Sequence, residues 1–217
     1  MSTTGRWTVV VVDDHPLFRK GAAQLLAMDS DFELLGEAAS GEEGIELART
    51  FNPDLVLLDL NMKEMNGIET LQVIKQANLE SLVIVLTVSN AEQDLVAALR
   101  HGADGYLLKD MEPEALLDKL RQAAAGNVVI DDAMMPLLAH AFRDDAAAPS
   151  AADVSLTERE DEILKLISEG MSNKQIARKL EISEGTVKVH VKNLLRKLNL
   201  GSRLESAVWA LENAGVR

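Results

Sequence analysis

Short apolar runs alternate with helical patterns over the first 130 residues of the chain. The runs are rich in Val, Ile and Leu and span residues 8–12, 32–36, 55–58, 82–86 and 105–108. Such runs are typical of strands that a parallel sheet buries on both faces, and the segments between them have the apolar spacing of helices. The pattern predicts an α/β domain with a doubly wound, five-stranded parallel sheet.

The last third of the chain has only helical patterns. Thr157 and Glu160 form a capping-box sequence at the start of a first helix, a second helix begins near Asn173, and Ser183 is the expected N-cap of a third. A helix, a short turn and a basic helix are the plan of a helix-turn-helix. We therefore expect a small all-α domain.

The end of the segment between these two parts has almost no large apolar residues that could join a core. Residues 131–142 predict a short linking helix with an Asp at its N-cap, and residues 143–155 are rich in Ala, Asp, Ser and Pro, which indicates a flexible tether. The predicted boundaries are thus a first domain at 1–130, a linker at 131–155 and a second domain at 156–217.

Charge is distributed unevenly between the two parts. The chain carries a net charge of −13, but residues 156–217 carry +2 and residues 1–155 carry −15. Within residues 172–197 seven basic residues stand against two acidic ones, a local excess that favours contact with phosphates. The absence of Cys excludes disulfides and thiolate metal sites. Without a run of about 20 apolar residues or a signal-peptide pattern, we expect a cytoplasmic protein that does not bind membranes.

Polar residues follow four of the five predicted strands. Asp13 and Asp14 follow the first strand, and the third, fourth and fifth are followed by Asp59, Thr87 and Lys109. Ligand sites of such sheets lie at the carboxyl ends of the strands, so these side chains should meet. Three carboxylates this close repel one another, and a hard divalent cation such as Mg²⁺ would relieve the repulsion.

This arrangement suits transfer of a phosphoryl group to a carboxylate. Asp59 stands alone and is the expected nucleophile, whereas the adjacent Asp13 and Asp14 are better suited to hold the metal, with the backbone carbonyl of Asn61 as a further ligand. Lys109 would bring a positive charge to the phosphoryl oxygens.

The third helix of the second domain divides into two faces at about 100° per residue. Val187, Val191, Leu194 and Leu198 form an apolar stripe, and Lys188, Val189, Lys192 and Arg196 lie opposite it. An aliphatic Val189 among lysines is suited to contact a thymine methyl group in a major groove, and the lysines to reach guanine edges or phosphates. The residues expected to contact DNA are Lys188, Val189, Lys192, Thr186, Arg178, Lys179, Arg196 and Lys197, of which Arg178, Lys179 and Lys197 would hold the phosphate backbone.

The segments VVDDHP, DLVLLDLNMKEMNG, VIVLTVSN and GADGYLLKD resemble the receiver domain of two-component response regulators, which has a flavodoxin-like fold. The resemblance implies Asp59 as phosphoacceptor, Asp13 and Asp14 as the acidic metal pair, and Lys109 as the phosphoryl-binding lysine. It also implies that Thr87 and Tyr106 act as a switch pair. Lys63 departs from the pattern, since the family usually has Pro there, and we expect altered phosphorylation rates.

The segment LTEREDEILKLISEGMSNKQIARKLEISEGTVKVHVKNLLRKL resembles the helix-turn-helix of the LuxR/FixJ class, and a receiver joined to it defines the NarL/FixJ subfamily. The resemblance implies a sensor histidine kinase, double-stranded promoter DNA and RNA polymerase as partners. It implies homodimers on DNA, with a dimer contact at residues 202–213, and no catalysis beyond phosphorylation and dephosphorylation of Asp59. It also implies a resting receiver that covers Lys188, Val189 and Lys192. Similarity to nitrate/nitrite regulators of the subfamily implies nitrate or nitrite respiration as the regulated process.

Three alternatives stay open at this stage. The chain could be a NarL/FixJ-type regulator of an unrelated signal. It could be a phosphatase with an Asp nucleophile, although such enzymes carry the nucleophile on the first strand in a DxDxT-like segment, where this chain has the DDHP metal pair. The second domain could bind RNA or protein in place of DNA.

Overall fold

The computed structural model describes residues 5–77, 79, 81–138, 156–169, 171 and 173–212. The expected tether at 143–155 lies outside the described residues. Among those that are described, no helix is both long enough and apolar enough to cross a membrane.

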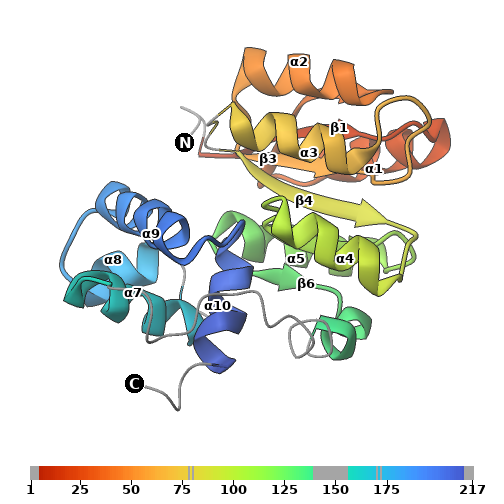
Figure 1. The fold of residues 1–217 in the computed structure, drawn as a ribbon. Helices are drawn as coiled ribbons and strands as arrows, with labels where there is room; N and C mark the ends of the chain where they lie inside the picture. Colours follow the sequence, from red (N-terminus) through yellow and green to blue (C-terminus); the bar gives the residue numbers. More distant parts are fainter. Residues whose placement is uncertain are drawn as a thin grey trace.

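A parallel sheet forms the centre of the first domain (Figure 1). Its strands are β1 (Trp7–Val12), β2 (Phe32–Ala38), β3 (Leu55–Leu58), β4 (Leu82–Thr87), β5 (Gly105–Leu108) and β6 (Val129–Ile130). They lie in the order β2-β1-β3-β4-β5-β6, and every neighbouring pair is parallel. The α/β class is confirmed, with one strand more than the five expected. The sixth has two residues, too few to produce a periodic signal, and exists because it pairs with Gly105 and Tyr106 of β5.

Helices cover both faces of the sheet. They are α1 (Pro16–Met28), α2 (Gly41–Phe51), α3 (Gly67–Gln76), α4 (Glu92–Arg100) and α5 (Pro113–Ala124). Alternate residues of each strand enter two separate apolar cores, one shared with α2, α3 and α4 and the other with α1 and α5. Burial on both faces explains why the strands are continuous apolar runs without polar alternation.

The linker begins as expected. The Asp131 side chain accepts a hydrogen bond from the Ala133 N–H and caps a 3₁₀ turn, η1 (Asp132–Met134), which continues as helix to residue 138. Residues 139–142 of the expected helix lie outside the described part. Met134 is fully buried in the core that α2, α3 and α4 share with the sheet, which fixes the start of the linker against the first domain.

Four helices form the second domain, α7 (Glu158–Ser168), α8 (Asn173–Lys179), α9 (Glu184–Leu198) and α10 (Arg203–Glu212). The capping box of Thr157 and Glu160 and the Ser183 N-cap are present as expected. The apolar stripe of α9 is buried against α7 and α8, and Trp209 of α10 completes this third core. The basic helix α9 therefore packs against the other described helices of the domain through one face.

Candidate functional site

Asp59 lies at the carboxyl end of β3 and is 1% exposed. Its backbone N–H donates to the Val12 carbonyl of β1, which aligns the ends of the two strands. One carboxylate oxygen, Oδ1, accepts a hydrogen bond from the Asn61 N–H at 3.2 Å. The other, Oδ2, is buried and forms an ion pair with the Lys109 ammonium at 2.8 Å. Asp59 thus presents one buried oxygen that a cation compensates.

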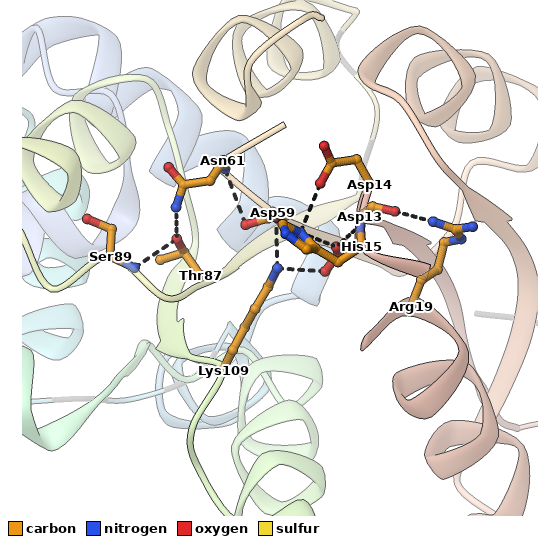
Figure 2. A network of polar contacts seen from close by, with 9 residues as sticks. All are labelled: Asp13, Asp14, His15, Arg19, Asp59, Asn61, Thr87, Ser89 and Lys109. Carbon is orange, nitrogen blue, oxygen red and sulfur yellow. Dashed lines mark hydrogen bonds and ion pairs between the residues drawn. The ribbon is translucent and has the colours of Figure 1, made fainter. Parts of the chain in front are cut away.

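Lys109 connects two of the carboxylates (Figure 2). Its ammonium lies 2.8 Å from Asp59 Oδ2 and 2.8 Å from Asp13 Oδ2, with only 7% of its side chain exposed. The ammonium also lies 4.7 Å from the centre of the Phe18 ring, a cation–π distance. A cation held between two buried carboxylates compensates their repulsion and is positioned to contact any anion bound at Asp59.

Asp13 and Asp14 lie beside Asp59 as expected, together with a residue that the sequence did not single out. Asp13 Oδ1 accepts a hydrogen bond from the His15 N–H at 2.8 Å, and the His15 ring nitrogen Nδ1 lies 2.9 Å from Asp14 Oδ1. Potential ligand atoms of Asp13, Asp14, His15 and Asp59 all lie within 4.8 Å of one another. The VVDDHP segment contained this signal, because His15 directly follows the acidic pair.

The residues of this cluster fit a hard divalent cation. Asp14 Oδ1 and Asp59 Oδ2 are buried, and each has one nitrogen neighbour, His15 Nδ1 at 2.9 Å and the Lys109 ammonium at 2.8 Å. Such oxygens are costly unless they are compensated, and carboxylate oxygens are the ligands that Mg²⁺ prefers. The acidic cluster of Asp13, Asp14 and Asp59 could therefore hold a metal ion.

A chain of hydrogen bonds leads from this cluster to α4. The Thr87 hydroxyl oxygen, fully buried, accepts from the Asn61 side-chain amide and from the Ser89 N–H, both at 3.1 Å (Figure 2). The Ser89 hydroxyl donates to the Asp94 carboxylate in the first turn of α4, and the Tyr106 hydroxyl donates to the Ser89 carbonyl at 3.0 Å. Ser89 thus links Thr87 to Tyr106 through one hydrogen bond to each. Ser89 and Asp94 were not predicted as functional residues, because no residue spacing in the sequence marks their role.

Tyr106 is held inward by this bond and by its surroundings. The side chain is fully buried against β4 and α4. Burial, with the nearby charge of Asp94, raises the pKa of its hydroxyl well above the usual value, so the group is neutral at physiological pH. A neutral phenol can exchange its hydrogen-bond partner without a change in charge.

The start of α3 lies against the loop that carries Asp59. The Gly67 N–H donates to the Leu60 carbonyl at 3.0 Å, and a Cβ at Gly67 would lie 2.2 Å from the Asp59 carbonyl oxygen. Only glycine allows this approach, which fixes the backbone of the loop. Lys63, where the resembling family has Pro, is exposed on the same loop.

On α9 the two faces are as expected. Val187 and Leu194 are fully buried, whereas Lys188, Lys192 and Val189 are exposed, Val189 by 60%. The first domain leaves these three side chains exposed in this structure. The prediction that the resting receiver covers them is therefore wrong for this structure. The first domain instead contacts α10, through α4.

The other residues expected to contact DNA differ in their surroundings. Arg178 and Arg196 are exposed, and the Thr186 hydroxyl is 2.7 Å from that of the N-cap Ser183. Lys179 forms an exposed ion pair with Glu169. Lys197 differs most, because its ammonium lies 2.6 Å from the buried Glu160 carboxylate and is engaged within the domain.

Two family models match the chain. "Response regulator receiver domain" covers residues 9–121, and "Bacterial regulatory proteins, luxR family" covers residues 154–210. The nitrate/nitrite response regulator protein NarL of Escherichia coli (strain K12) is 53% identical over 96% of this chain and 97% of its own length. NarP, a nitrate/nitrite response regulator protein of the same strain, is 44% identical over 96% of each chain. The crystal structure of ChrA, a response regulator in a heme-sensing two-component system, is 32% identical, with a TM-score of 0.52 over 97% of this chain and 98% of that one.

Proposed function

Because the chain belongs to the response regulators that join a receiver domain to a LuxR-type DNA-binding domain, we propose that it controls promoters of nitrate or nitrite respiration. The receiver domain implies a sensor histidine kinase as partner, and the second domain implies promoter DNA. The nitrate or nitrite assignment is supported by the identity to NarL and NarP over nearly the full length of the chain. A histidine kinase and promoter DNA as partners support the cytoplasmic location that we propose.

The observation that carries the phosphorylation site is the buried Oδ2 of Asp59, which lies 2.8 Å from the Lys109 ammonium. This oxygen attacks the phosphorus of the kinase's phosphohistidine in line, so that an O–P bond forms as the P–N bond breaks. Lys109 then shares its charge with the phosphoryl oxygens. Mg²⁺ held by Asp13, Asp14, Asp59 and the Asn61 carbonyl would neutralise negative charge on the transferring group. We assign the protein no catalysis beyond phosphorylation and dephosphorylation of Asp59.

Thr87 carries the signal away from the site. Its hydroxyl is held by Asn61 and Ser89 in the structure, and a phosphoryl group on Asp59 offers a stronger, charged acceptor. When the hydroxyl turns to donate to that group, the Ser89 N–H loses its partner and the loop before α4 moves. Tyr106, bound to the Ser89 carbonyl, moves with it.

The exposed face of α9 is the DNA-reading surface. Lys188, Val189 and Lys192 enter the major groove, while Arg178, Lys179, Arg196 and Thr186 hold phosphates and fix the register. Lys197 is assigned a structural contact within the domain, because its ammonium pairs with the Glu160 carboxylate. We further propose that the protein binds paired half-sites as a homodimer and there contacts RNA polymerase.

Footprinting on a nitrate-reductase-type promoter tests this function, with and without acetyl phosphate and Mg²⁺. The native chain is compared with Asp59→Asn, which keeps the size of the side chain but removes the nucleophile. We expect protection only for the phosphorylated native protein. Phosphorylation without protection would discard nitrate and nitrite and leave a regulator of another signal. Steady turnover of a phosphomonoester by the same preparation would favour a phosphatase instead.

A further inference from the structure

The His15 ring lies among the carboxylates of the acidic cluster (Figure 2). Its nitrogen Nδ1 is 2.9 Å from Asp14 Oδ1, 3.6 Å from Asp13 Oδ1 and 3.8 Å from Asp59 Oδ2. Within the part of the chain that the structure describes, these four residues are the one group of His, Asp and Glu side chains close enough to share a metal ion. A nitrogen that can bind a metal therefore stands beside three oxygens that can do the same.

The backbone brings His15 to the acidic cluster. The His15 N–H donates to Asp13 Oδ1 at 2.8 Å, and the His15 carbonyl accepts from the Arg19 N–H in the first turns of α1 at 3.0 Å. Pro16 follows as the first residue of α1, where its fixed φ suits the start of a helix. The His15 side chain is 64% exposed and caps no backbone group of the helix. The ring can therefore adjust its position without disturbing either core of the receiver.

The spacing of these atoms is close to that of ligands around one ion. Ligands about 2.1 Å from a divalent ion lie about 3.0 Å apart in octahedral geometry and about 3.4 Å apart in tetrahedral geometry. The three distances from His15 Nδ1 lie within about 0.4 Å of these separations. A small movement of the ring is therefore enough for Nδ1 and the carboxylate oxygens to contact the same ion.

The charge around the ring also favours a divalent cation. Three carboxylates stand against the single ammonium of Lys109, which lies 2.8 Å from Asp13 Oδ2 and 2.8 Å from Asp59 Oδ2. A neutral imidazole can carry its proton on either nitrogen, so His15 can offer the Nδ1 lone pair without a change in this charge. The cluster thus keeps an excess of negative charge while it gains a nitrogen ligand.

Imidazole nitrogen and carboxylate oxygen favour different metals. Mg²⁺ takes oxygen ligands and keeps several waters, so the carboxylates of the cluster and the Asn61 carbonyl would be sufficient to hold it. Zn²⁺, Fe²⁺ and Co²⁺ bind imidazole well, and a nitrogen ligand adds far more to their affinity than to that of Mg²⁺. The presence of His15 at this position therefore changes which ion the cluster prefers.

We propose that His15 is a metal ligand of the acidic cluster, which takes transition-metal ions such as Zn²⁺ through the same carboxylates as Mg²⁺ and, in addition, through Nδ1. The ring thereby raises the preference of the cluster for Zn²⁺ over Mg²⁺, and the two ions compete for the residues around Asp59. The inference rests on the proposed function only in that this function places Mg²⁺ at the same carboxylates.

His15→Phe tests this ligand, because phenylalanine keeps a planar ring and lacks the nitrogen. Isothermal titration of the full chain with Zn²⁺ and, separately, with Mg²⁺ measures both affinities. We expect the Zn²⁺ affinity of the variant to fall at least about tenfold, the lower end of the loss seen even for residues that only support a metal ligand. The Mg²⁺ affinity should change by less than about twofold, because its oxygen ligands remain.

Two further variants are the controls. His101→Phe makes the same replacement at an exposed histidine of the receiver, after the end of α4 and outside the acidic cluster. It should bind both ions as the native chain does. Asp14→Asn removes a carboxylate that both ions share and should weaken the binding of both.

Nuclear magnetic resonance of the native chain supplies a measurement that needs no variant to fold. The ¹⁵N resonance of His15 Nδ1 should shift strongly when Zn²⁺ is added, because the nitrogen binds the ion directly. Mg²⁺ at a saturating concentration should leave this resonance close to its metal-free position. The ring nitrogens of His101 should respond to neither ion.

The outcomes separate this inference from the proposed function. Equal losses of Zn²⁺ and Mg²⁺ affinity in His15→Phe would show that the ring only positions Asp14, and unchanged affinities would show that it has no role in binding; either result overturns the proposal. A His15 resonance that ignores Zn²⁺ overturns it as well. Phosphorylation of Asp59 with Mg²⁺ would stand in all three cases. A native chain that binds neither ion and is not phosphorylated would refute both the ligand and the proposed function.

Discussion

At the scale of single residues, Glu160 has two functions in the DNA-binding domain. Its carboxylate accepts from the Thr157 N–H at 2.8 Å, which closes the capping box, and from the Lys197 ammonium at 2.6 Å. Burial raises the pKa of this carboxyl, but the bonds from Lys197 and Thr157 outweigh burial, and its pKa lies below the usual value of 4.5. A carboxylate of this kind stabilises the folded state only while it is ionised.

Glu160→Gln should therefore destabilise the DNA-binding domain in a pH-dependent way. We expect a loss of about 1 kcal/mol at pH 7, because the amide cannot accept a charge-assisted bond from Lys197. The folded-state pKa is depressed, so the native contribution is present above pH 4.5 and is lost as the pH falls through the folded-state value. Urea unfolding at pH 7 and near pH 3 measures this, and the two proteins should converge at the lower pH.

Glu158→Gln is the control for this experiment. Glu158 lies in the same first turn but is exposed, so its replacement should change stability by a few tenths of a kcal/mol through the helix dipole. A loss for Glu160→Gln that was equal at both pH values would contradict the assignment of the carboxylate.

At the scale of elements, α9 separates packing from recognition within two residues. Val187 is fully buried, whereas Val189 is 60% exposed and lies between the exposed Lys188 and the half-buried His190. The helical period places these two valines on opposite faces. Replacement of Val187 by Ala should therefore lower stability, whereas the same replacement at Val189 should weaken DNA binding.

Val189→Ala should leave the unfolding free energy within about 0.5 kcal/mol of native and weaken specific promoter binding by about 1 kcal/mol, through loss of a methyl contact. Val187→Ala should cost about 2 kcal/mol of stability. Thermal unfolding and gel-shift titrations on specific and scrambled duplexes distinguish the two. Equal loss on both duplexes for Val189→Ala would show that Val189 does not read bases.

At the scale of the whole molecule, two domains with separate cores are joined by a small contact. The receiver has one core on each face of its sheet, and the helical domain has its own around Val187 and Trp209. A ligand that binds one domain should therefore stabilise mainly that domain. The acidic cluster that would hold the proposed metal, with Asp14 and Asp59, lies in the receiver.

Mg²⁺ should raise the unfolding temperature of the receiver and leave the transition of the helical domain nearly unchanged. At ten times its Kd the ion would contribute about 1.4 kcal/mol. Differential scanning calorimetry in Mg²⁺ and in EDTA measures the shift, and Asp14→Asn should abolish it. A shift that persists in Asp14→Asn would place the ion elsewhere.

The sequence by itself determined features that depend on neighbours along the chain. The apolar runs predicted the strands, the caps at Thr157 and Ser183 predicted two helix starts, and the carboxylates at strand ends predicted the acidic cluster around Asp59. The predictions of strands and helix starts succeed because strand burial and helix capping are set by residues within a few positions of one another. The prediction of the acidic cluster succeeds because parallel strands bring their carboxyl ends together.

Only the tertiary structure decided the contacts between residues that are distant in sequence. No local pattern marks the pairing of Lys197 with Glu160, the position of Ser89 between Thr87 and Tyr106, or the two-residue strand β6. The meeting of Gly201 with Arg100 across the two domains is of the same kind. Each depends on the packing of whole elements, because a glycine or a lysine acquires such a role only from the groups that the fold places beside it.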